Sequence, residues 1–65
     1  MKIENGSLYS VMRYTKKTDW TDLGILNGED VKLIIRGWRK MEDFGNTVIY
    51  DREGTASMID VTKVC

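Results

Sequence analysis

Apolar and polar residues alternate in several short runs along the chain, and glycine rather than proline separates the runs. The first run, Ser7–Thr15, has apolar side chains on both parities, which is typical of a curved strand shared between two sides of a small barrel. The clearest hairpin joins Thr47–Tyr50 to Thr55–Val61 across Asp51–Gly54, where Gly54 supplies a left-handed position. We expect Thr62–Cys65 to add a short closing strand.

Two stretches lack this alternation and are predicted to be loops. Lys16–Asp30 begins with a polar run and contains Trp20, and its apolar residues can hold it against the core: Leu23, Ile25 and Leu26. Asn27-Gly28 within it is a strong turn signal, because both residues tolerate a positive φ. Arg39–Asn46 is expected to be a second, polar loop carrying Met41 and Phe44.

Val31–Trp38 has two interpretations. As a strand, it places Val31, Leu33 and Ile35 on one face, with Gly37 at a bend. The other interpretation is a helix over Glu29–Phe44, in which the apolar residues follow a 3.6-residue period: Val31, Ile34, Ile35, Trp38 and Met41. The β-branched residues favour the strand, and Gly37 would cost a helix about 1 kcal/mol relative to alanine. The helix stays open as the alternative.

The predicted order is strand, long loop, diverging turn, strand, medium loop, hairpin and closing strand. Over residues 7–64 this order resembles the Src-homology-three-like small barrel. The best local match is the diverging turn within Asp22–Leu33, and Leu8-Tyr9 and Asp51–Gly54 are similar to that family's first strand and distal hairpin. The expected fold is therefore all-β, a small five-stranded barrel. The alternative is α+β, with a helix over 29–44 packed on a β-hairpin sheet.

The chain departs from the peptide-binding members of that family at two places. Their aromatic pair at the start of the third strand is replaced by Asn46–Ile49, and their proline and tyrosine by Met58–Val61. We therefore expect no proline-peptide groove, because fold alone does not carry function.

Length and composition narrow the class of protein. Sixty-five residues predict a single domain, 1–65, with a small core. Ten Lys and Arg balance ten Asp and Glu, whereas nucleic-acid binders usually show a basic excess. There is no histidine and the one cysteine is Cys65, so we expect no zinc site, no intramolecular disulfide and no cofactor.

The compartment is expected to be cytoplasmic. No apolar run is long enough to span a membrane, and Met1–Gly6 lacks the apolar core of a signal peptide. So small a chain is compatible with a phage or mobile-element accessory or inhibitory protein that acts on a host protein in the host cytoplasm.

Catalysis is not expected. A serine nucleophile would lack its histidine base, and no phosphate-cradling glycine motif occurs. The acidic pairs Glu29-Asp30 and Glu42-Asp43 are adjacent in sequence and are interpreted as surface charges. Cys65 lies at a frayed terminus, which offers nothing to activate its thiol.

Three non-catalytic functions remain, and the first is a protein-binding module. Trp20 can anchor a protein partner or cap one end of the core. If Val31–Trp38 is a strand, one of its faces forms a basic and aromatic strip that consists of Lys32, Ile34, Arg36, Trp38 and Lys40. The alternative is that Ile34 and Trp38 belong to the barrel wall. The second function is nucleic-acid binding, which would add Arg13, Lys16, Lys17 and Arg39. The third is a homo-oligomeric structural component that pairs open barrel edges.

Overall fold

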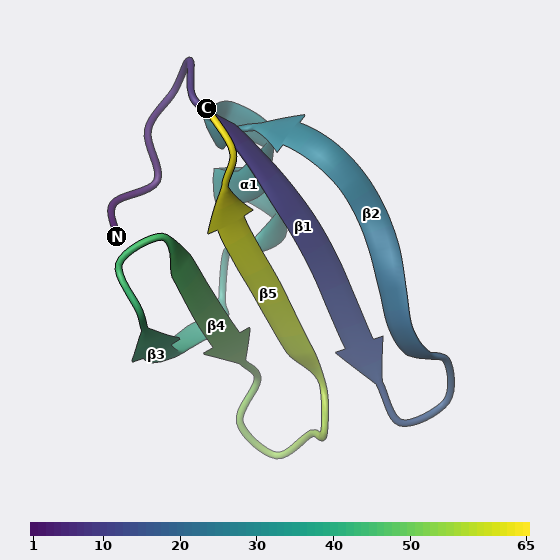
Figure 1. The fold of residues 1–65 in the computed structure, drawn as a ribbon. Coiled ribbons are helices and arrows are strands. Elements are labelled where there is room, and N and C mark those ends of the chain that lie inside the picture. The colour runs from purple at the N-terminus through teal and green to yellow at the C-terminus, as the bar shows by residue number, and fades with distance from the viewer.

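The computed structural model, which describes residues 1–65, is a five-stranded antiparallel sheet with one short helix (Figure 1). Along the chain the elements are β1 (Leu8–Thr15), β2 (Asp19–Asn27), α1 (Gly28–Ile34), β3 (Arg39–Asp43), β4 (Thr47–Asp51) and β5 (Met58–Lys63). The strand order is β2-β1-β5-β4-β3. β2 and β3 are both edges, so the sheet does not close and the predicted barrel is not formed. The coarser prediction of a mainly β fold is confirmed.

The two faces of the sheet differ sharply in burial. On one face, alternate residues of the three central strands β1, β5 and β4 are buried: Tyr9, Val11, Ile59, Val61, Val48 and Tyr50. We call this the inner face, and α1 lies against it, behind the sheet in Figure 1. Val31 of α1 is fully buried there. Each such side chain stabilises the fold by roughly 1.5–3 kcal/mol, so this small cluster supplies much of the stability.

The prediction of a strand over Val31–Trp38 is wrong, and the helical alternative is right only for its first part. The Asn27 side-chain oxygen accepts a hydrogen bond from the backbone N–H of Asp30 at 2.9 Å, which caps the helix. Glu29 and Asp30 then occupy the first turn, where acidic side chains favour the helix dipole. The helix ends at Ile34, and Gly37 has a φ of 82° in the turn that follows. Capping and burial of Val31 therefore outweigh the β-branched residues.

The predicted loop over Lys16–Asp30 is also wrong, because most of it is β2. The turn is confined to residues 16–18, where the Thr18 N–H donates to the Thr15 hydroxyl at 3.0 Å. Asn27-Gly28 makes no hairpin turn but begins the helix, so the predicted diverging turn does not exist. The sequence of β2 does not alternate between apolar and polar residues, because an edge strand can expose most of its side chains.

The predicted loop over Arg39–Asn46 is wrong for the same reason. Its first five residues form β3, which pairs with β4 and is exposed throughout. Arg39 binds Asp51 of β4 through two bonds, Nε to Oδ1 at 3.0 Å and Nη2 to Oδ2 at 2.8 Å. Pairing between strands, rather than an apolar pattern, holds this edge in place.

The first strand and the hairpin are confirmed with small changes, whereas the predicted closing strand over Thr62–Cys65 is wrong. The first strand begins at Leu8, one residue after the predicted Ser7. The hairpin is present as β4 and β5, although β5 begins at Met58 rather than Thr55. The C-terminal residues add no separate strand, because Thr62 and Lys63 belong to β5 and the Val64 N–H donates to the Leu8 carbonyl at 2.8 Å.

The N-terminal residues pack against the start of α1 and complete the core. Ile3 is buried, and the Glu4 N–H donates to the Tyr9 hydroxyl oxygen at 2.9 Å. Gly28, the first residue of α1, packs so closely on this segment that a Cβ atom would overlap the Glu4 carbonyl. Residue 28 must therefore be glycine for steric reasons, although its φ is not positive.

We expect Gly28→Ala to lower the free energy of unfolding by about 1–3 kcal/mol, the range for overpacking a tight contact. The sign of this change is informative, because a glycine-to-alanine substitution in an uncrowded helix would raise the free energy of unfolding by about 1 kcal/mol. Urea unfolding followed by circular dichroism measures the change. Leu33→Ala on the exposed side of α1 is the control and should stay near the wild type. A more stable Gly28→Ala variant would contradict the close approach to Glu4.

Asp43 lies at the end of β3. The Met1 amino group, and then the Gly45 N–H at 2.9 Å, bind its carboxylate and hold its pKa at about 2. The pKa is depressed on folding, so the carboxylate stabilises the fold above its unfolded pKa of about 4. This contribution is lost as the pH falls through about 2.

The difference in melting temperature between the wild type and Asp43→Asn should therefore be constant near neutral pH and shrink between about pH 4 and pH 2. Glu53→Gln is the control, since Glu53 is exposed in the β4–β5 turn. A difference that did not change with acidification would refute the role of Asp43.

Candidate interaction surface

The strip predicted along Val31–Trp38 is not a single surface. Its residues are distributed over α1, the turn after it and β3, because residues 28–34 are helical. Ile34 and Trp38 pack against the core, although not as residues of a barrel wall. Lys32 donates to the Asn5 side chain at 3.0 Å, and Lys40 pairs with Asp43 at 3.5 Å.

Trp38 has a cationic neighbour of its own. The Arg52 guanidinium lies 5.3 Å from the centre of the Trp38 ring, a cation–π contact. Because the ring is half-buried and already covered, it offers little surface to a partner. Arg36 lies in the exposed turn between α1 and β3.

Trp20 is placed differently. It lies on β2 directly opposite Tyr14 of β1, and the two ring centres are 5.5 Å apart with planes tilted by 53°. Its side chain is 43% exposed and does not cap the core. The neighbouring ring limits its freedom, so Trp20 is a large apolar group that is already ordered.

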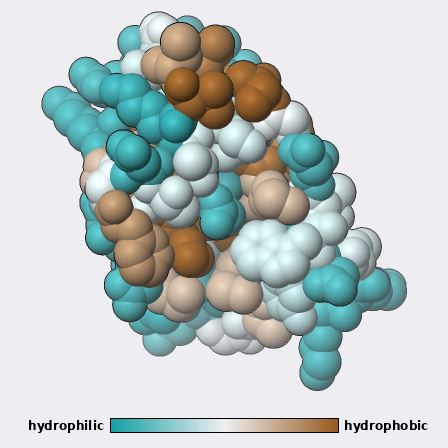
Figure 2. Space-filling model, viewed as in Figure 1, coloured by the Kyte–Doolittle hydropathy of each residue, from teal (hydrophilic) through white to brown (hydrophobic).

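Trp20 belongs to the sheet surface that faces away from α1, which we call the outer face. The register places apolar residues next to one another across β1, β2, β4 and β5 on this face: Leu8, Met12, Tyr14, Trp20, Ile25, Ile49 and Met58. Figure 2 views the molecule from this side and shows brown and pale atoms across the sheet, with brown gathered near the C-terminus. No element of the chain covers these residues.

The charges of the outer face are mainly acidic. Asp22 and Asp60 flank Met12 on β2 and β5, and Glu42 lies at the β3 edge opposite Ile49. Arg39 is the basic residue of this face, and its two bonds to Asp51 lower the pKa of that carboxyl. The outer face is therefore an apolar sheet surface with an excess of negative charge.

The residues of the nucleic-acid alternative are only partly brought together. Arg13, Lys16 and Lys17 lie at the β1–β2 hairpin, and Arg13 has the inner-face parity of Val11. Arg39 lies on β3 at the other edge of the sheet, separated from β1 by β5 and β4, and on the outer face. These four cations do not form one row.

The sequence pattern singled out Trp20 as a candidate site residue, but it did not indicate the other residues of the outer face. Leu8, Met12 and Tyr14 share one parity of β1, and this shared parity was the signal that could have indicated a common apolar face. Ile25 could not be placed, because it was expected in a loop. Its position depends on the pairing of Ser10 with Ile25, which only the fold defines.

Other chemistry is sparse. No cluster of three or more His, Cys, Asp or Glu side chains could hold a metal ion, and α1 has neither the length nor the apolar character to cross a membrane. Cys65 is exposed and unpaired. Comparison of the chain with known protein families, with curated proteins and with solved structures finds no match.

Proposed function

We propose that the protein is a non-catalytic binding module that docks on another protein through its outer face. The observation that carries this proposal is the ordered Trp20–Tyr14 pair within an uncovered apolar sheet surface. Tryptophan and tyrosine are enriched at the centres of protein interfaces, because a rigid ring buries a large area at a low entropic cost. We place this action in the cytoplasm, where the exposed Cys65 thiol would stay reduced.

The charge of the face defines the chemistry of the partner. Asp22, Asp60 and Glu42 surround apolar residues and are not neutralised by lysine or arginine. A matching surface presents basic side chains around an apolar centre, since complementary charge speeds association and rejects wrong partners. The same acidic groups would repel nucleic-acid phosphates, so the outer face supports a protein partner.

A second copy of this chain fits less well. Two outer faces brought together would oppose like charges. The open edges are also poorly suited to pairing, because bulges interrupt the ladder at Val11/Met12 beside β2 and at Lys40/Glu42 in β3. Bulges and charged residues are the usual devices that keep edge strands apart.

The test compares the proteins that wild type and variants capture from a lysate of the source cells. We expect Trp20→Ala to remove the main captured protein, with a loss of about 2 kcal/mol or more in binding free energy. Leu33→Ala is the matched control, because Leu33 is an exposed apolar residue on α1, on the other side of the sheet. It should capture the same protein as the wild type.

A charge reversal at the rim tests the chemistry of the partner. Glu42→Lys should lower the rate of association with the captured protein, and this rate should depend less on salt concentration than the rate of the wild type. If capture were insensitive to Trp20→Ala, or equally reduced by Leu33→Ala, docking through the outer face would be wrong. Faster association of Glu42→Lys would contradict a basic partner.

A further inference from the structure

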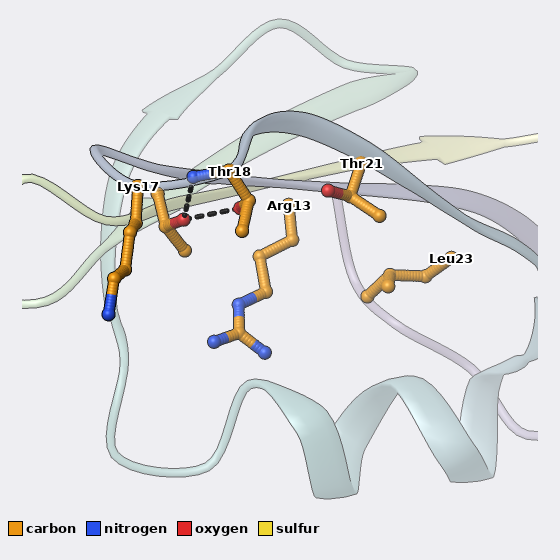
Figure 3. A pocket seen from close by; sticks show the side chains of 6 residues that line it. Arg13, Lys17, Thr18, Thr21 and Leu23 are labelled. Atoms are coloured by element: carbon orange, nitrogen blue, oxygen red, sulfur yellow. Dashed lines mark hydrogen bonds between the residues drawn. The ribbon is translucent and has the colours of Figure 1, made fainter.

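The inner face of the sheet is not covered along its whole length. At the β1–β2 hairpin it opens into a pocket of about 450 Å³, on the same side of the sheet as α1 (Figure 3). Six residues line this pocket: Arg13, Thr15, Lys17, Thr18, Thr21 and Leu23. It lies on the opposite side of the sheet from the outer face, so it is a separate surface.

The register explains why these side chains meet. Arg13 continues the inner-face row of Tyr9 and Val11 and lies opposite Thr21 of β2. The pairing shifts between Val11 and Met12, which leaves Leu23 as the extra residue of β2. In Figure 3 the Arg13 guanidinium points away from the strands into the pocket, toward the side on which α1 lies.

The threonines of the pocket have different tasks. The Thr15 hydroxyl accepts the Thr18 N–H at 3.0 Å and is hydrogen-bonded to the Thr18 hydroxyl, so these two groups shape the hairpin turn (Figure 3). Arg13, Lys17 and Thr21 take no part in the side-chain hydrogen bonds and ion pairs of the protein. The pocket therefore gathers three free donors around a turn that is held by its own bonds.

The charges in the pocket are uncompensated. Arg13 and Lys17 line it and no carboxylate does. By contrast, other cations of the sheet have acidic partners: Arg39 with Asp51, Lys40 with Asp43 and Lys63 with Glu4. A concave site with two unpaired cations and a free hydroxyl attracts an anion, and the planar fork of arginine matches the oxygens of a phosphate group.

We propose that this pocket binds a small molecule that carries a phosphate group. Arg13 and Lys17 contact the phosphate oxygens, Thr21 donates a further hydrogen bond, and Leu23 offers an apolar contact to the rest of the ligand. The volume falls within the range of about 300–1,000 Å³ that small-molecule sites occupy. A nucleic-acid strand would need a continuous row of cations, whereas this face offers one bounded site.

The test is an NMR titration of the ¹⁵N-labelled protein at constant ionic strength. The probes are inorganic phosphate, adenosine monophosphate and a short single-stranded oligonucleotide, with sodium chloride as the control. We expect saturable amide shifts confined to residues 13–23, and tighter binding of the monophosphate ester than of inorganic phosphate. Shifts that do not saturate, or that chloride reproduces, would overturn the site.

Variants locate the site and separate it from the outer face. Arg13→Gln and Lys17→Gln should each weaken binding of the monophosphate about tenfold, the loss expected for one charge-assisted contact. Lys32→Gln on α1 and Trp20→Ala on the outer face should bind it as the wild type does. A monophosphate affinity unchanged by Arg13→Gln would refute the proposal. Tighter binding of the oligonucleotide would overturn the small-molecule assignment.

Discussion

The fold depends on the junction between β2 and α1, at Asn27 and Gly28. The Gly28 N–H donates to the Ser7 carbonyl at 2.9 Å, so it still belongs to the ladder, while the Asn27 side chain already caps the helix. The absence of a side chain at residue 28 lets the N-terminal segment cross directly over this point. One pair of residues thus ends a strand, begins a helix and positions the segment that carries Ile3 into the core.

Because α1 is short, this junction also decides what is left uncovered. A helix that begins at Gly28 and ends at Ile34 buries Val31 in the core on the inner face but does not cover the β1–β2 hairpin. That hairpin keeps Arg13 and Lys17 beside an open pocket. The outer face is covered by nothing and carries Asp22, Asp60 and Glu42 among apolar residues. The sheet therefore separates a basic pocket from an acidic and apolar surface.

The open sheet follows from the same arrangement. β2 and β3 lie at opposite ends of the strand order, and the chain between them forms α1 instead of a strand that could join the two edges. Both edges remain free but irregular, since the ladder shifts at Val11/Met12 and at Lys40/Glu42. Such irregularities limit pairing between copies.

The sequence by itself determined the elements whose side chains alternate strongly. The β4–β5 hairpin was predictable, because half of its residues must be buried and the period of two is visible in the chain. β1 was predictable as a strand, although its apolar residues fall on both parities. The sequence also singled out Trp20, as either a partner anchor or a cap on the core, but its exposure beside Tyr14 came only from the fold. Only the tertiary structure decided the remainder. β2 and β3 are edge strands stabilised by pairing and not by burial, so their residues carry no apolar period. The choice between strand and helix after Asn27 rested on one capping bond and on the burial of Val31 in a core that only the fold assembles. The two surfaces likewise depend on register, which brings Arg13 to Thr21 and Tyr14 to Trp20, and local pattern does not contain that information.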